Sequence, residues 1–178
     1  MTKSTATTIN PETVIALQNG GGVRATIQPG DITLDEVFQV MPFGNSLGIL
    51  DLTGAEIREA LELSVKDAPN PFGGFLQVSG LKFTYDSRKP VGEKVITVEV
   101  KEKDGNYVPL DDAKHYFVAT NTFTAKGGDG YTMFKKAYEE GRLSEPGFVD
   151  WEMFRDYLTT NPNAVPTVEG RIVDVALN

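Results

Sequence analysis

The chain has 178 residues, of which 40% are hydrophobic and 24% charged, as expected for a single globular domain. Its formal net charge of −8 argues against a broad surface for nucleic acid polymers or anionic membranes, although it allows a small basic pocket. The absence of cysteine excludes disulfides, thiolate catalysis and cysteine-based metal sites. No apolar run approaches the roughly 18 residues of a transmembrane helix, so we expect no membrane span.

The first part of the chain leads into a glycine-rich loop. Residues 1–12 are polar and rich in threonine, and we expect them to form a loose leader. The apolar run that follows predicts a buried strand over residues 13–18. Three glycines within residues 19–24 then leave the backbone open to close approach, and Arg24 offers a guanidinium that matches phosphate or carboxylate. An anion-binding loop and an ordinary turn with a solvated arginine are equal alternatives at this point.

Two capping boxes predict the starts of helices. Thr33 is followed three residues later by Glu36, so the hydroxyl can accept from the third helical amide while the carboxylate reaches back. The same spacing recurs at Thr53 and Glu56, and the helix after it carries a one-sided apolar stripe. Between these helices, the apolar run at 47–52 predicts a second strand.

The second half of the chain alternates strand-like and helix-like patterns. Alternate residues of 81–85 are apolar, and in the strand predicted at 95–100 Ile96 shares a face with Val98 and Val100. The further predicted elements are a turn at 103–106, a strand at 115–120, a Gly-rich loop at 122–130, helices at 131–141 and 149–158, and a strand at 171–176. Hairpin-type and crossover-type connections both occur, so the pattern predicts an α/β or α+β fold with a mixed β-sheet and flanking helices.

Residues that could catalyse a reaction are scarce. His115 is the only histidine, and it is better interpreted as a structural or surface residue than as a metal ligand, since metal sites use several His, Cys or clustered carboxylates. A Ser–His–Asp triad would need that same histidine, and no Gly-x-Ser-x-Gly elbow exists. Asp111-Asp112 fits a turn cap better than an acid–base pair. The sequence therefore predicts no catalytic residue and no metal ligand in this chain.

Two irregular loops each carry an aromatic residue beside glycine. Phe43 lies in the loop at 42–45 and Phe123 in the loop at 121–131, and loops of this kind often hold ligands. Two interpretations stay open: each ring plugs the core, or the two rings form a slot for a flat ligand such as a nucleobase. Asp129, between two glycines, either accepts from vicinal hydroxyls, as carboxylates do at ribose, or is a turn carboxylate.

These residues carry a family resemblance. Three motifs stand in order: Asn-Gly-Gly-Gly-Val-Arg at 19–24, Pro-Phe-Gly-Asn at 42–45 and Phe-x-x-x-Gly-Gly-Asp-Gly at 123–130. The ordered set strongly resembles the C-terminal domain of the 5′-nucleotidase/UDP-sugar hydrolase/2′,3′-cyclic-nucleotide 2′-phosphodiesterase family. Residues 75–80 and 171–172 also match, and the resemblance covers roughly residues 13–176.

The resemblance implies one domain of a two-domain hydrolase. Members of this family are usually secreted or cell-surface proteins, so the parent protein is expected to be extracellular, periplasmic or associated with the cell wall. Their N-terminal metallophosphatase domain holds two divalent metal ions and a catalytic His–Asp pair. Their C-terminal domain binds the nucleoside part of the substrate and delivers the phosphate.

Carried over motif by motif, the resemblance implies a nucleotide site made of seven residues: Asn19, Arg24, Phe43, Asn45, Gly73, Phe123 and Asp129. Phe43 and Phe123 would sandwich the base, while Asn45 and the backbone of Gly73 would meet its edge. Asp129 would hold the ribose hydroxyls. The loop arginine, with the asparagine that opens its loop, would meet phosphate and sugar.

The sequence departs from the family at its start. The metallophosphatase motifs are absent, and residues 1–12 do not resemble the helix that leads into the family's first strand. We therefore expect a loose or externally added segment at 1–12 and the family domain at 13–178, which binds a nucleotide but does not catalyse alone. Its partner would be the N-terminal metallophosphatase domain with its two metal ions. The alternative is a non-enzymatic module on the same fold that binds protein or glycan.

Overall fold

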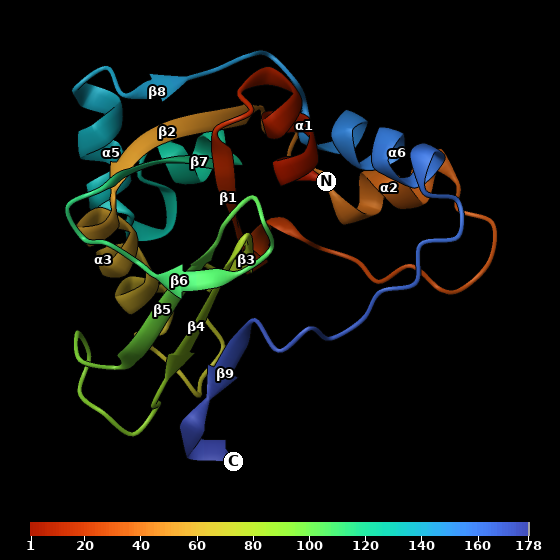
Figure 1. Cartoon of the computed structure of the whole chain (residues 1–178). Helices are drawn as coiled ribbons and strands as arrows, with labels where there is room; N and C mark the ends of the chain where they lie inside the picture. Colours follow the sequence, from red (N-terminus) through yellow and green to blue (C-terminus); the bar gives the residue numbers. More distant parts are fainter. Residues whose placement is uncertain (178) are drawn as a thin grey trace.

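Figure 1 shows the computed structural model, which describes residues 1–177. Within these residues, nine strands form two sheets, with the order β3-β1-β7-β2-β8 in the first and β6-β5-β4-β9 in the second. The strands are β1 (Thr13–Asn19), β2 (Leu47–Thr53), β3 (Leu76–Ser79), β4 (Leu81–Tyr85), β5 (Val95–Lys101), β6 (Tyr107–Pro109), β7 (His115–Asn121), β8 (Leu143–Ser144) and β9 (Ile172–Asp174). The α-helices are α1 (Thr2–Ile9), α2 (Leu34–Val40), α3 (Gly54–Ser64), α4 (Thr122–Ala125), α5 (Thr132–Glu139) and α6 (Asp150–Thr160), and short 3-10 turns lie at Gly20–Gly22, Gly128–Gly130 and Val175–Leu177.

The predicted mixed architecture with flanking helices is confirmed, although the strands are divided between two sheets. In the first sheet β1 runs parallel to β7, while β3 pairs antiparallel with β1, and β2 pairs antiparallel with both β7 and β8. In the second sheet β4 runs antiparallel to β5 and parallel to β9. Both sheets are therefore mixed.

The first sheet is covered on both faces. One face carries the main core, in which Leu17, Leu50 and Phe134 are fully buried together with residues of α3, α5 and the second sheet. The other face carries a smaller cluster, where side chains of β1, β2 and β7 pack with Ala6 of α1 and Met153 of α6. Because successive side chains of a strand point to opposite faces, one strand serves both clusters. Each large apolar side chain buried in this way contributes roughly 1.5–3 kcal/mol.

The predicted loose leader at 1–12 is wrong for most of its length, because Thr2–Ile9 form α1 directly before β1. Threonine is a weak helix former, so the local sequence gives little sign of this helix. Packing compensates for the low propensity: Ala6 is fully buried against the sheet. The hydroxyl of Thr7 donates to the carbonyl of Lys3 at 2.8 Å, which satisfies it within the helix. The expected absence of a helix before the first strand is therefore also wrong.

One residue of β5 faces the opposite way from its prediction. Ile96 is 43% exposed, whereas Val98 and Val100 are buried. Thr84 pairs with Thr97 and the next residue of β4 pairs with Val95, so Ile96 is an extra residue in the ladder. Such a β-bulge reverses the alternation locally, and period-two reasoning cannot locate it.

Both predicted capping boxes are confirmed. At the start of α2, the Glu36 amide donates to the Thr33 hydroxyl at 3.3 Å and the Thr33 amide donates to the Glu36 carboxylate at 2.7 Å. Thr53 and Glu56 make the same exchange at α3, at 3.2 and 2.8 Å. The region 122–130, predicted as a loop, instead contains α4 and a 3-10 turn.

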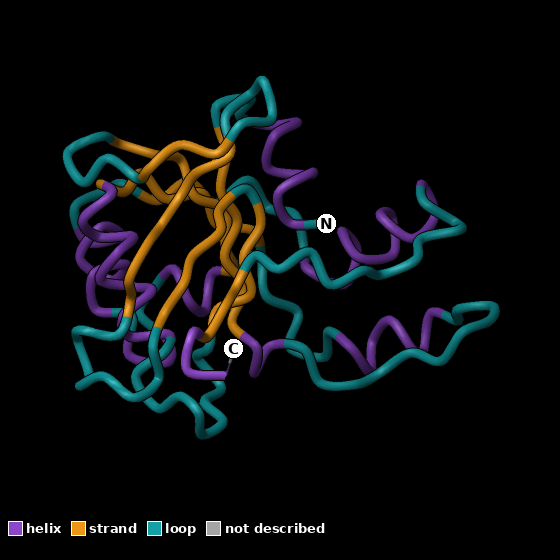
Figure 2. Tube along the Cα trace, turned by 60° about the horizontal axis from the view of Figure 1, so that its bottom comes forward, coloured by secondary structure: helices purple, strands orange, loops and turns teal. Residues whose placement is uncertain are grey.

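Helices α2 and α6 form an arm at one side of the sheets. Figures 1 and 2 show these helices and their flanking loops extending away from the body of the molecule. Phe38 of α2 and Trp151 of α6 pack with ring centroids 4.7 Å apart. The arm holds the loop at 42–45, which follows α2.

A largely buried ion pair ties the start of α3 to the segment before β8. The Glu56 carboxylate accepts from two nitrogens of Arg142, at 2.7 and 3.0 Å. The hydrogen bonds from Arg142 lower the pKa of Glu56, the capping hydrogen bonds from Thr53 add to this effect, and burial opposes it. Since the folded-state pKa is lowered, the stabilisation is present above the ordinary pKa of glutamate and is lost as the pH falls through the folded-state value.

We predict that Glu56→Gln lowers the free energy of unfolding by about 2 kcal/mol near pH 7, because it removes the charge from the hydrogen bonds with Arg142. The deficit shrinks at about pH 3, below the ordinary pKa of glutamate, because the carboxylate of the unfolded wild-type chain has the higher pKa and its protonation favours unfolding. Urea denaturation at both pH values measures it. Glu59→Gln, at an exposed position of the same helix, is the control and changes stability by less than about 0.5 kcal/mol. A deficit of equal size at both pH values contradicts the assignment.

Candidate functional site

The topology of the first sheet gathers four loops at one edge. Parallel strands end on the same side, so β1 and β7 finish together, at Asn19 and Asn121. β2 is antiparallel to β7 and begins at Leu47, opposite Asn121. β3 is antiparallel to β1, and its first residue, Leu76, pairs with Asn19. We call this edge, where β1 and β7 end and β2 and β3 begin, the loop edge.

All seven predicted site residues lie at the loop edge or on the segments that meet it. The segments are residues 19–24 after β1, 42–46 before β2, 71–75 before β3 and 122–131 after β7. The first and last of these segments lie about 100 residues apart in the sequence, and the hydrogen bond between Asn19 and Asp129 spans 110 residues. The register of the strands brings these four segments together, and no local sequence signal indicates that they meet.

The glycine loop packs against the segment that contains Gly73. The amide of Gly21 donates to the carbonyl of Gly73 at 2.7 Å, and the amide of Gly20 donates to the carbonyl of Phe75 at 2.8 Å. A Cβ on Gly21 would lie only 3.0 Å from the Gly73 oxygen. Glycine is needed here because two backbones meet directly. The Gly73 backbone thus lies beside the loop that presents Arg24.

Asn19 and Asp129 are in direct contact. Asn19 is only 4% exposed, and its amide nitrogen donates to Oδ2 of Asp129 at 2.9 Å. The amide oxygen of Asn19 accepts from Asn121 at 2.8 Å and from Gln18 at 3.3 Å. Asp129 has a φ of 56°, in the left-handed region that aspartate tolerates better than most residues. Its other oxygen, Oδ1, makes no hydrogen bond with the described residues, so it remains available to a ligand.

Both phenylalanine rings are on the surface. Phe43 is 59% exposed and Phe123 is 47% exposed, so neither ring plugs the core. Their segments are joined, because the amide of Thr122 donates to the carbonyl of Ser46 at 2.8 Å and the amide of Ser46 donates to the Thr122 hydroxyl at 3.2 Å. The structure therefore brings the two loops together, although the rings of Phe43 and Phe123 do not stack on each other.

Asn45 is held through its backbone by Asp150, the first residue of α6. Its amide donates to the Asp150 carboxylate at 3.1 Å, and its carbonyl accepts from the Asp150 amide at 2.8 Å. Asp150 is buried, and this burial raises the pKa of its carboxyl group. The start of α6 thereby fixes the Phe43 loop.

Arg24 is exposed and forms no ion pair with the described part of the chain. Its backbone amide donates to the carbonyl of Val40 at 3.0 Å, and its guanidinium makes one long contact of 3.4 Å with the carbonyl of Gly21. An arginine without an acidic partner keeps its donors available for an anion.

Three further residues support the site and were not identified from the sequence. Asn121 donates to Asn19 and caps α4, Asp150 holds the Asn45 backbone, and Tyr131 is fully buried with its hydroxyl donating to the carbonyl of Gly74. Burial raises the pKa of Tyr131 well above its usual value, so it stays a donor. Only Asn121 had a local signal, since asparagine before a short helical segment is a favoured N-cap.

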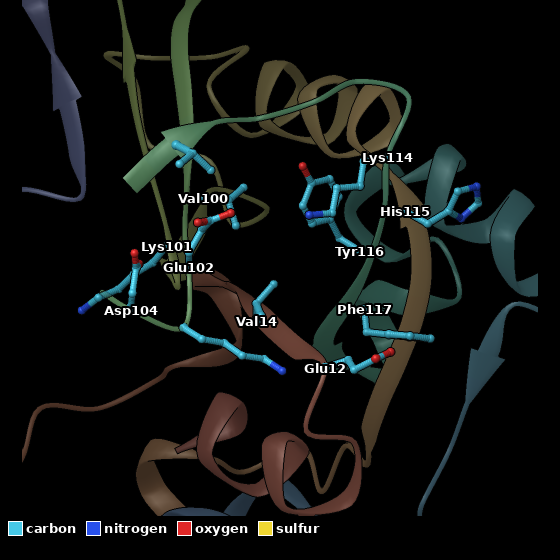
Figure 3. Close-up of a pocket in the computed structure, with 12 residues that line it drawn as sticks. Glu12, Val14, Val100, Lys101, Glu102, Asp104, Lys114, His115, Tyr116 and Phe117 are labelled. Carbon is cyan, nitrogen blue, oxygen red and sulfur yellow. The ribbon is translucent and has the colours of Figure 1, made fainter. Parts of the chain in front are cut away.

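A separate cleft of about 610 Å³ lies at the opposite end of β7 (Figure 3). Val14, Val100 and Tyr116 contribute to its apolar lining, and charged residues of both signs contribute to the rest. His115 also lines it and lies 2.7 Å from Oδ1 of Asp51. None of the seven predicted site residues lines this cleft, so the cleft is separate from the predicted site at the loop edge.

The described residues do not fit a metal centre. No group of three or more His, Cys, Asp or Glu side chains among residues 1–177 could hold a metal ion. We therefore derive no metal-dependent step from these residues. No described helix is both long and apolar enough to cross a membrane.

The matching family model and two of the chain's relatives all describe nucleotide phosphoesterases or 5′-nucleotidases. The sequence model of the family described as "5′-nucleotidase, C-terminal domain" matches residues 2–136, so the match includes α1. The chain is 45% identical over 164 residues to the trifunctional nucleotide phosphoesterase YfkN of Bacillus subtilis, covering 92% of this chain and 11% of that protein. It is 36% identical over 165 residues to the snake venom 5′-nucleotidase of Macrovipera lebetinus, covering 89% of this chain and 40% of that protein.

The fold is shared with solved structures. The 5′-nucleotidase precursor of Thermus thermophilus matches with a TM-score of 0.89 and 48% identity, covering 96% of this chain and 33% of that one. The chain thus spans well under half the length of each of these three proteins. On the family match and these identities, the chain belongs to the family of 5′-nucleotidase C-terminal domains.

Proposed function

We propose that the loop edge binds the nucleoside part of a nucleotide, as the substrate-recognition domain of a two-domain nucleotidase that hydrolyses phosphate esters. One observation carries the proposal. Two exposed phenylalanines, Phe43 and Phe123, stand on joined loops at the same edge as Asp129, whose carboxylate keeps one oxygen free. Stacking surfaces and a hydrogen-bond acceptor are the two groups that a base with its ribose requires.

Each predicted residue has a role in this proposal. Phe43 and Phe123 stack on the base, and the side chain of Asn45 meets its edge beside the backbone of Gly73. Asp129 accepts from the ribose hydroxyls. The unpaired guanidinium of the glycine loop binds the phosphate. Asn19 acts through Asp129, since its own amide is buried and engaged within the protein.

Hydrolysis is assigned to another part of the parent protein. Attack by a metal-activated water needs a cluster of metal ligands, and residues 1–177 offer none. In this proposal the chain alone binds without catalysing, and an N-terminal metallophosphatase domain holds the two divalent ions. This chain covers only a minor part of the length of its relatives, which supports a division of binding and hydrolysis between two domains. A location outside the cytoplasm is proposed from the venom relative.

We predict that Phe43→Ala and Phe123→Ala each weaken adenosine binding by about 5- to 150-fold, because one stacked ring contributes ~1–3 kcal/mol. Isothermal titration calorimetry with adenosine and with AMP measures the loss. Ile96→Ala is the control, since it removes an exposed apolar side chain from the second sheet. Unchanged affinity in the double Phe→Ala variant contradicts the stacking slot. If no nucleoside or nucleotide perturbs the NMR signals of either loop, the non-enzymatic interaction module is favoured.

We predict that Asp129→Asn weakens adenosine binding about tenfold or more, because the free carboxylate oxygen is lost as an acceptor for the ribose hydroxyls. Binding of 2′,3′-dideoxyadenosine, which lacks those hydroxyls, stays within about twofold. Calorimetry with both probes measures the difference. Asp104→Asn, in the exposed β5–β6 turn, is the matched control and leaves both affinities unchanged. Equal losses for the two probes contradict a ribose role for Asp129.

A further inference from the structure

Asn121 is a buried polar residue at the centre of the loop edge. It is the last residue of β7 and only 3% exposed. Its side chain uses both of its ends. The amide oxygen accepts from the backbone amide of Thr124 at 2.8 Å, and the amide nitrogen donates to Oδ1 of Asn19, also at 2.8 Å. Asn121 therefore touches both the helix that follows β7 and the end of β1.

The contact with Asn19 continues to Asp129. Asn19 accepts from Asn121 through its oxygen, so its nitrogen is turned towards Asp129, where it donates to Oδ2 at 2.9 Å. An amide has one acceptor end and one donor end, and fixing one end fixes the other. The three side chains form a directed chain of hydrogen bonds, which we call the amide relay: Asn121 to Asn19 to Asp129.

The relay acts on a short, glycine-rich 3-10 turn at Gly128–Gly130. Glycines flank Asp129 at 127, 128 and 130, and glycine leaves more backbone freedom than any other residue. A carboxylate on such a loop needs an external tie to keep one orientation. The relay provides that tie from two strand ends, and it occupies Oδ2 so that Oδ1 is the oxygen left for a ligand.

The other end of Asn121 acts on Phe123. By accepting from the Thr124 amide, Asn121 caps α4, the short helix on which Phe123 lies. The Phe123 ring in turn lies close to Gly128, where a Cβ would come within 2.5 Å of it. One side chain thereby sets both the ring and the carboxylate.

We infer that Asn121 is a positioning residue of the nucleoside site: through the amide relay it sets the direction of the Asp129 carboxylate, and through the α4 cap it sets the place of Phe123. The inference rests on the proposed function. Asn121 does not touch the ligand. Pre-organising the carboxylate lowers the ordering cost of binding, so its effect depends on the presence of the ribose hydroxyls.

The test separates the relay from the cap. Asn121→Ser keeps a good N-cap for α4, but the shorter side chain cannot reach Asn19. We expect adenosine affinity to fall about 3- to 10-fold, as for the loss of one positioning hydrogen bond, and 2′,3′-dideoxyadenosine affinity to stay within about twofold. Asn19→Ser cuts the same relay without touching the cap and should give the same probe-selective loss. Asn106→Ser, at an exposed turn, is the control and changes neither affinity.

Backbone amide exchange in the ligand-free chain provides a second readout. Both relay variants should speed exchange at residues 128–130 and leave the centre of β7 unchanged. Equal affinity losses for the two probes, or no loss for either, overturn the inference. If the wild-type chain binds no adenosine, the proposed function fails. The relay is then judged by exchange alone, and unchanged exchange at 128–130 overturns it.

Discussion

The parallel pairing of β1 with β7 determines where the proposed ligand site lies. Parallel neighbours end at the same edge, so Asn19 and Asn121 meet there, and the antiparallel partners β2 and β3 begin beside them. Four segments far apart in the chain thereby converge, and a change in the pairing of β1 would separate the glycine loop from the Asp129 loop. The core clusters on the two faces of the first sheet keep this pairing in register, since a slip of one residue would exchange its buried faces.

The loops at this edge are rich in glycine, yet each is tied by a specific contact. Gly21 is held by Gly73, the carbonyl of Gly74 by the buried Tyr131, and Asn45 by Asp150. Glycine lets the backbones approach closely, and these hydrogen bonds remove the freedom that glycine would otherwise leave. The exposed groups therefore stand on a constrained backbone. Such an arrangement is better suited to binding a small rigid ligand than to forming a broad interface.

Local signals in the sequence were enough for some features and not for others. Thr33 and Thr53 act within one helical turn, so their capping boxes could be predicted, and the ordered loop motifs identified the family. The helix containing Ala6 depends on burial against a sheet that the local sequence does not show. The contact between Asn121 and Asn19 spans 102 residues and follows from strand register alone. The residues proposed to touch a ligand could thus be named from the sequence, but the side chains that hold them in place could not.

The charge of the chain constrains which contacts could supply affinity in the proposed nucleotide site. The chain carries −8 overall, and Asp129 places a carboxylate inside the proposed site, so the field around it repels a phosphate. Arg24 is a single exposed cation, which gives only modest attraction in water. Under the proposed function, affinity must therefore come from stacking and ribose contacts, which are neutral or short-range. In the same proposal, a phosphate that this domain holds weakly stays accessible to a metal centre on another domain, to which the hydrolysis is assigned.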